Sequence, residues 1–224
     1  MTTLRNRVAT DSRYLLLSLP TALVSFPLVV AGVSAGLGAA VVFAGLPLLA
    51  ATAWLARNVA DAERASLPGV LGHPVARPRY REAPVWAGWF RRMMNPLASG
   101  QAVMDLLHVI IAFPVVVAAS VVAAVWWLGT LAGLAFPLYG WIIAGIPGAI
   151  ETGLPGALGF ADSPALFVVW NTVLGLLFAI TLPPVLRGAA LVRASLAELM
   201  LTRPAFAHPS VSAHIVDPAV TRIA

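Results

Sequence analysis

The sequence predicts an all-α integral membrane protein with four transmembrane helices arranged as two tandem hairpins. Of its 224 residues, 60% are hydrophobic and only 10% are charged, whereas about a quarter of the residues of a soluble domain are charged. Two runs contain no charged side chain, residues 14–56 and residues 106–150. A helix over either run would be about twice as long as the ~30 Å hydrocarbon core of a bilayer. The first run is therefore expected to fold back and cross twice, and the second to cross once and to continue in an outer loop.

In the first run we expect spans at 14–32 and 37–55. The break falls where Gly32, Gly36 and Gly38 cluster, because glycine has a low helix propensity. Gly32 and Gly36 also have the spacing of a close-packing motif. At a predicted turn, however, glycine already has a reason to be present.

Residues 57–104 are expected to form a cytoplasmic loop that is rich in arginine and proline. Near its end a helical face combines aromatic and basic side chains, which is typical of a helix lying among lipid headgroups. A short helix that caps the bundle explains the same pattern equally well. These side chains are candidates for docking a partner, together with two arginines near the C-terminus: Trp86, Trp89, Phe90, Arg91, Arg92, Arg187 and Arg193.

In the second run we expect a third span at 106–128, and beyond it a fourth at 164–185, followed by an amphipathic extension to Thr202. The intervening segment 129–162 is rich in glycine and proline, which favours an apolar outer loop. Gly129 and Gly133 repeat the close-packing spacing, but they too fall at an expected turn. The membrane domain would thus cover 14–202, and residues 203–224 are expected to be a disordered cytoplasmic tail.

All 14 basic residues are arginine, and they determine the predicted orientation. In the four-span arrangement they fall in the N-terminal segment 1–13, in the middle loop or after the last span. Basic residues accumulate on the cytoplasmic side of membrane proteins, so both termini are predicted to be cytoplasmic. A fifth span at 131–150 would place Arg187 and Arg193 outside. A sequence repeat with an offset of 136 residues, from Leu46-Pro47 to Leu182-Pro183, agrees with two similar hairpins.

Few residues are candidates for a catalytic, binding or metal-ligating role. The chain has no cysteine, and no nucleophile, base and orienting group occur together, so we predict no catalytic, cofactor or metal site. Asp105 and His108 lie one turn apart and could form a proton-sensitive pair, although a helix-start aspartate beside an interfacial histidine needs no function. Asn171, in the fourth span, is a candidate signal contact, but a hydrogen bond between helices is the simpler explanation.

The order of several motifs resembles that of the putative sensor domain family, found at the N-terminus of many actinobacterial sensor histidine kinases. The motifs are Arg13-Tyr14-Leu15-Leu16-Leu17, Gly45-Leu46-Pro47-Leu48-Leu49, Gly88-Trp89-Phe90-Arg91-Arg92 and Leu182-Pro183 with Arg193. The resemblance covers roughly residues 13–202. It implies a membrane-embedded input module whose last helix passes a signal to a cytoplasmic kinase. The 22 residues after Thr202 have no room for a kinase, so we expect another polypeptide to receive the signal.

Three functions follow as hypotheses. The first is a stand-alone sensor module that relays a membrane or lipophilic signal by helix repacking to a histidine kinase or regulator. The second is a non-catalytic accessory subunit of a larger membrane complex such as a transporter. The third, a solute permease, is disfavoured because no span carries a charge. The expected surroundings are the lipid bilayer of the plasma membrane and a protein partner, with no nucleic acid, since basic patches occur only in segments that border the membrane.

Overall fold

The structure, a computed structural model, describes residues 3–40, 45–75, 100–151 and 163–202, together with residues 86, 88, 91, 94, 95, 156 and 159. Within this part of the chain it consists of four long helices and contains no strand. They are α1 (Leu4–Gly38), α2 (Gly45–Leu71), α4 (Gly100–Ala144) and α6 (Pro164–Leu201). The predicted all-α class is therefore confirmed.

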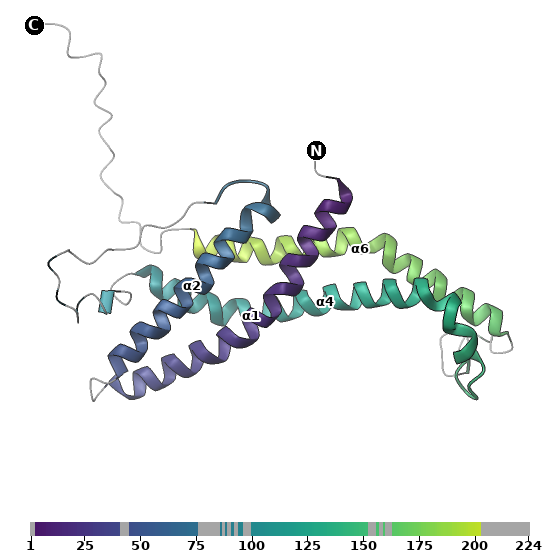
Figure 1. Ribbon diagram of the computed structural model, residues 1–224, viewed down its shortest axis with the longest axis horizontal. Helices are drawn as coiled ribbons and strands as arrows, with labels where there is room; N and C mark the ends of the chain where they lie inside the picture. Colours follow the sequence, from purple (N-terminus) through teal and green to yellow (C-terminus); the bar gives the residue numbers. More distant parts are fainter. Residues whose placement is uncertain are drawn as a thin grey trace, which may run out of the picture.

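α4 and α6 lie side by side along the long axis of the molecule, and the α1–α2 hairpin crosses them near one end (Figure 1). α4 has 45 residues and α6 has 38, which correspond to about 67 Å and 57 Å at 1.5 Å per residue. Both are longer than a bilayer core is thick. The two helices therefore extend well beyond the region where the hairpin packs against them.

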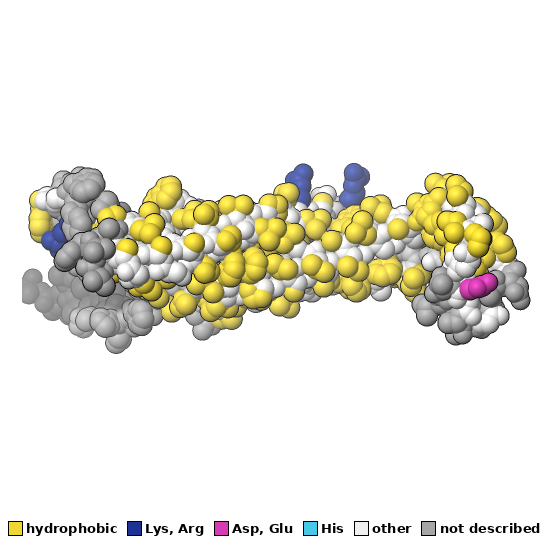
Figure 2. All heavy atoms as spheres, turned by 90° about the horizontal axis from the view of Figure 1, so that it is seen from below, with side chains coloured by type: hydrophobic (Ala, Val, Ile, Leu, Met, Phe, Trp, Pro, Cys, Tyr) yellow, Lys and Arg dark blue, Asp and Glu magenta, His cyan; other side chains and the backbone are white. Residues whose placement is uncertain are grey.

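Three of the helices, α1, α4 and α6, are long and apolar enough to cross a membrane. α2 does not meet the same criteria, because Arg57, Asp61, Glu63 and Arg64 lie within it. Large apolar side chains are exposed along the molecule, and apolar groups cover most of the face shown in Figure 2. Such a surface indicates a protein that resides in a membrane.

The first turn lies later in the chain than predicted. α1 continues to Gly38 and α2 begins only at Gly45, so the expected spans 14–32 and 37–55 are displaced. Gly32 and Gly36 lie inside α1, where an added Cβ would come within 2.2 Å of the Thr52 hydroxyl and 2.6 Å of the Leu49 side chain, respectively. These glycines allow α1 and α2 to approach closely and do not break the helix.

The predicted outer loop 129–162 is also wrong in its first half, because α4 is helical to Ala144. Gly129 faces the Phe178 ring, and a Cβ on Gly133 would lie 2.3 Å from the Cα of Gly175. Here too the glycines serve helix contact. Likewise, α6 runs unbroken through Pro183 and Pro184 to Leu201, so the expected fourth span and its extension are one helix.

Two tandem hairpins of the same orientation would place the first and third spans parallel, but α1 and α4 contact each other in the opposite order. Near the start of α1, Ser12 accepts a hydrogen bond from the indole of Trp127 and Leu15 O accepts one from Ser120. Farther along α1, Phe26 stacks on Phe113 with ring centroids 4.0 Å apart. Residue numbers thus rise along α1 as they fall along α4, and the two helices run antiparallel where they cross.

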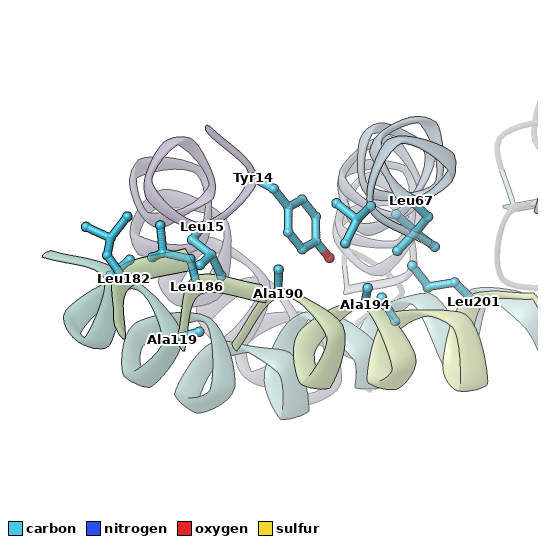
Figure 3. Packing of buried hydrophobic residues seen from close by; sticks show 13 residues of the cluster. Tyr14, Leu15, Leu67, Ala119, Leu182, Leu186, Ala190, Ala194 and Leu201 are labelled. Carbon is cyan, nitrogen blue, oxygen red and sulfur yellow. The ribbon is translucent and has the colours of Figure 1, made fainter. Parts of the chain in front are cut away.

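The largest core cluster joins all four helices at this crossing. Leu15, Leu67, Leu186 and Leu201 are fully buried there, and alanines of α6 provide a flat surface beneath them (Figure 3). Because these alanines have short side chains, α1 and α2 can approach α6 closely. The same junction contains the polar groups described next.

Candidate functional site

Two adjacent residues of α2, Glu63 and Arg64, both contact α6, but Glu63 also binds α1 and Arg64 also binds α4. Successive residues of an α-helix point about 100° apart around its axis. Glu63 therefore faces α1 and the side of α6 that carries Arg193, whereas Arg64 faces α4 and the C-terminal end of α6. Charged groups buried among helices are costly unless they are paired, and each of these two is paired.

Arg193 of α6 joins Glu63 to α1. Its Nη2 donates to both carboxylate oxygens of Glu63, at 2.9 and 2.7 Å, and its Nη1 donates to Tyr14 O at 2.7 Å and to the Ser18 hydroxyl. The Tyr14 hydroxyl donates to Glu63 at 2.5 Å, and the guanidinium lies 4.0 Å from the centroid of the Tyr14 ring. The guanidinium is thus held by charge, hydrogen bonds and a cation–π contact.

Arg64 forms the second ion pair. Its Nη2 lies 2.6 Å from Oδ1 of Asp105, its Nη1 donates to Asp61 at 2.7 Å and its Nε donates to Leu201 O at 3.1 Å. Asp105 is completely buried, and it also accepts a hydrogen bond from Gln101 at 3.2 Å. This pair fixes the start of α4 and the end of α6 to the second half of α2.

A third contact joins α6 to the N-terminal part of α1. Nη1 of Arg187 lies 3.3 Å from Oδ1 of Asp11 and donates to Val70 O at 2.8 Å. Asp11 precedes the charge-free run, and burial raises the pKa of its carboxyl above the ordinary value while Arg187 partly offsets the rise.

A cavity of about 450 Å³ lies between α1, α2 and α4 and reaches Arg193 of α6. This volume is within the ~300–1,000 Å³ range of small-molecule sites. Buried side chains form its inner wall, including Tyr14, His108, Ala112 and Arg193. Exposed side chains of α1 and α2, such as Leu17 and Ala62, form its outer rim.

Two buried polar atoms of the cavity-lining residues have no hydrogen-bond partner, Nδ1 of His108 and Nε of Arg193. Both residues are only 4% exposed. An unpaired polar atom in a buried position costs free energy, so these two atoms lower the stability of the helix junction beside the cavity.

The predicted site residues lie in different surroundings. Asp105 and His108 both belong to this junction, Asp105 in an ion pair and His108 on the cavity wall. Asn171 lies far along α6 and donates to Phe167 O of its own helix, so its recorded hydrogen bond does not cross between helices. Among the described residues, no group of three or more histidines and acidic side chains is positioned to hold a metal ion.

The predicted docking residues fall into three groups. Arg193 is buried in the network and Arg187 is engaged with α1 and α2, so Arg193 cannot serve as an exposed docking residue. Trp86 is exposed, and the Arg91 guanidinium lies 5.4 Å from its ring centroid. Trp89, Phe90 and Arg92 lie outside the residues whose side chains the structure describes.

Sequence reasoning missed Tyr14, Glu63 and Arg64 as members of the site. A signal was present, because Glu63 and Arg64 are charged residues in a helix that continues an apolar span, and charges in such a position usually have partners within the protein. Apart from Asp61, their partners are more than 40 residues away along the chain, and only the tertiary structure identifies them.

A protein-family model described as "Putative sensor" matches residues 14–201 of the chain. This range includes all four helices from Tyr14 onward and the two ion pairs that join α2 to other helices. The chain belongs to the Putative sensor family. The expected resemblance is thereby confirmed, and a sensor-type role in a membrane follows from family membership together with the three apolar helices. No curated protein and no solved structure matches the chain of this sensor-family member.

Proposed function

We propose that this protein is a sensor-type membrane module that receives a membrane or lipophilic signal and relays it to a separate partner by helix repacking. Family membership supports the sensor-type role. The proposed partner is a cytoplasmic or membrane protein such as a histidine kinase or a regulator. Neither an enzymatic role nor nucleic-acid binding is part of the proposal.

One observation carries the proposal: Arg193 lines the cavity and also holds α1, α2 and α6 together. A molecule that enters the cavity therefore contacts the group on which the packing of three helices depends. α4 forms the remaining wall through His108, Val109 and Ala112. Occupancy of the cavity can thus favour one arrangement of the helices over another, provided that the ligand binds the two with different affinity.

The arginines that follow the first hairpin favour a cytoplasmic segment 57–104, which is where such a partner would bind. Trp86 and Arg91 belong to that segment and carry exposed aromatic and basic groups. We propose this segment as the docking surface, and Arg193 as part of the internal linkage.

The test is affinity purification of the tagged protein from its native membrane in mild detergent, followed by mass spectrometry. A co-purifying kinase or transcriptional regulator supports the proposal, and its recovery should fall when Trp86 and Arg91 are both replaced by alanine. A matched variant with Trp141→Ala, at an exposed position on the distal part of α4, should retain the partner. Stoichiometric recovery of transporter subunits would contradict the sensor role and identify an accessory subunit.

A further inference from the structure

His73 joins the end of α2 to the last turn of α6. α2 ends at Leu71, and Gly72 follows with φ +82° and donates its backbone N–H to Pro68 O at 3.0 Å. This left-handed conformation is typical of a glycine that terminates a helix. It turns the chain away from the axis of α2, and Nε2 of the next residue, His73, lies 3.8 Å from Oε1 of Glu198 on α6.

The two ring nitrogens of His73 face two acceptors. Nδ1 lies 3.3 Å from the carbonyl oxygen of Pro74, and Nε2 faces the carboxylate of Glu198. A neutral imidazole carries one N–H, so it presents a donor to one of these oxygens and a lone pair to the other. A protonated imidazolium carries two N–H groups and presents a donor to both. The arrangement therefore suits the charged ring better than the neutral one.

The pair is accessible to protons from water. The side chains of His73 and Glu198 are 54% and 37% exposed, whereas His108, the other histidine in the described part of the chain, is only 4% exposed. Within that part, no acidic side chain other than Glu198 lies within 4.0 Å of the His73 ring nitrogens. Histidine ordinarily changes charge between pH 5 and 8, where carboxylates are ordinarily ionised. The attraction therefore exists in acid and is lost as the pH rises and the ring loses its proton.

Other charged groups at these helix ends do not imitate this response. Arg64 and Arg187 also tie the two ends together, through Leu201 O and Val70 O, but arginine stays protonated throughout this pH range. Asp11 of α1 accepts from Arg187, and protonation of a carboxylate in acid would weaken that contact, which is the opposite effect. The remaining charged groups of this junction form arginine–carboxylate pairs that would respond in the same opposite sense: Asp61, Glu63, Asp105 and Arg193.

We propose that His73 and Glu198 form a proton-dependent latch between the end of α2 and the end of α6. In acid the charged ring holds the two ends together, and at alkaline pH the neutral ring releases them. His73 follows α2 within segment 57–104, which continues to Trp86 and Arg91, so the latch fixes where the proposed docking surface leaves the helices. This inference deepens the proposed sensor role and rests on it for its consequence, because it specifies how docking is regulated.

The test is hydrogen-exchange mass spectrometry of the full chain in phosphatidylcholine nanodiscs, comparing wild type with Glu198→Gln at the same pH. The amides of Gly72 and Thr202 report on the two helix ends, since they bond to Pro68 O and Glu198 O. An exposed ion pair changes an equilibrium by up to about fivefold. At about pH 5.5, where histidine is largely charged, Glu198→Gln should raise exchange of both amides by up to this factor. At about pH 8 the two proteins should exchange equally.

Two further variants make the comparison specific. His73→Gln should raise exchange in acid as Glu198→Gln does, and the double variant should show no additional effect, because both substitutions remove one interaction. Glu151→Gln is the matched control, since Glu151 is also exposed but lies beyond the far end of α4, and it should leave exchange unchanged. Additive effects of the two substitutions, or an effect of Glu198→Gln that is equal at both pH values, would overturn the proposal.

Exchange is measured without a partner, so a failure of the latch is distinguishable from a failure to recover a partner by co-purification. A partner that is recovered should be recovered in different amounts at acidic and alkaline pH from wild type, and in equal amounts from Glu198→Gln. The same pH dependence in both proteins would refute the regulation of docking by the latch.

Discussion

The hydroxyl of Tyr14 lies 2.5 Å from the carboxylate of Glu63, and the same carboxylate lies 2.7 Å from the guanidinium of Arg193. Three helices that are distant in sequence thus share one charged group. Tyr14 is also the residue with which the family match begins. The arrangement makes the junction sensitive to small changes in any of the three side chains.

Tyr14→Phe is expected to destabilise the protein by about 1–2 kcal/mol. It removes one hydrogen bond to an ionised partner but keeps the ring on which Arg193 lies. Thermal unfolding in a mild detergent measures the effect. Tyr139→Phe is the matched control, since the Tyr139 hydroxyl donates to a carbonyl at an exposed position, and its effect should be smaller. Equal losses in the two variants would contradict the importance of the Tyr14 contact.

Asp105→Ala is expected to lower the free energy of unfolding by about 1.5–3 kcal/mol, because Arg64 loses the closest of its carboxylates and keeps the partly exposed Asp61. Unfolding in increasing concentrations of denaturing detergent measures the loss. The double variant Arg64→Leu, Asp105→Leu should be more stable than Asp105→Ala, since it removes both buried charges together. If the double variant is less stable than Asp105→Ala, the expectation is wrong, and the ion pair contributes more stability than its burial costs.

Gly133→Ala should destabilise the α4–α6 pair by about 1–3 kcal/mol. The added methyl group would overlap the backbone at Gly175, which cannot move aside as a flexible side chain can. Gly188→Ala is the control: a Cβ there meets no atom within 4 Å, and alanine favours the helix by about 0.5–1 kcal/mol. The two substitutions should therefore change the thermal midpoint in opposite directions.

Paired cysteines test the antiparallel crossing of α1 and α4. The chain contains no native cysteine, so Phe26→Cys with Phe113→Cys introduces a single reactive pair at stacked positions. We expect a short bis-maleimide to cross-link this pair in native membranes, with a shift in gel mobility. Phe26→Cys with Val125→Cys should remain unlinked. The reverse result would support parallel spans.

The sequence was sufficient to predict the all-α class and the presence of long apolar helices, because charge-free runs leave few alternatives in a membrane, but the helices begin and end at other residues than expected. The interpretation of the glycines was wrong. Gly32 and Gly133 were interpreted as turn residues, but both lie inside helices at sites of close approach. From the sequence alone, a glycine that ends a helix cannot be distinguished from a glycine that lets a neighbouring helix pack closely.

The site was predictable only in part. Asp105 and His108 were selected as a possible proton-sensitive pair one turn apart, and both lie at the junction. The partners of Asp105 could not be deduced, because its pairing with Arg64 depends on how α2 lies against α4. Arg193 was expected on the surface, since arginines near a span end usually face water. Its burial follows from the carboxylate of Glu63 on a helix that sequence alone does not place beside it.

The adjacency of Glu63 and Arg64 limits how α2 can move. Glu63 is bound to α1 and Arg64 is bound to α4. Only one rotation of α2 about its own axis allows both contacts. Turning it about its axis, or sliding it by one residue, separates both pairs at once. Intermediate settings leave two buried ions uncompensated and are disfavoured. α2 is therefore expected to stay in this one setting until both pairs separate together, so a weak stimulus would leave it unmoved.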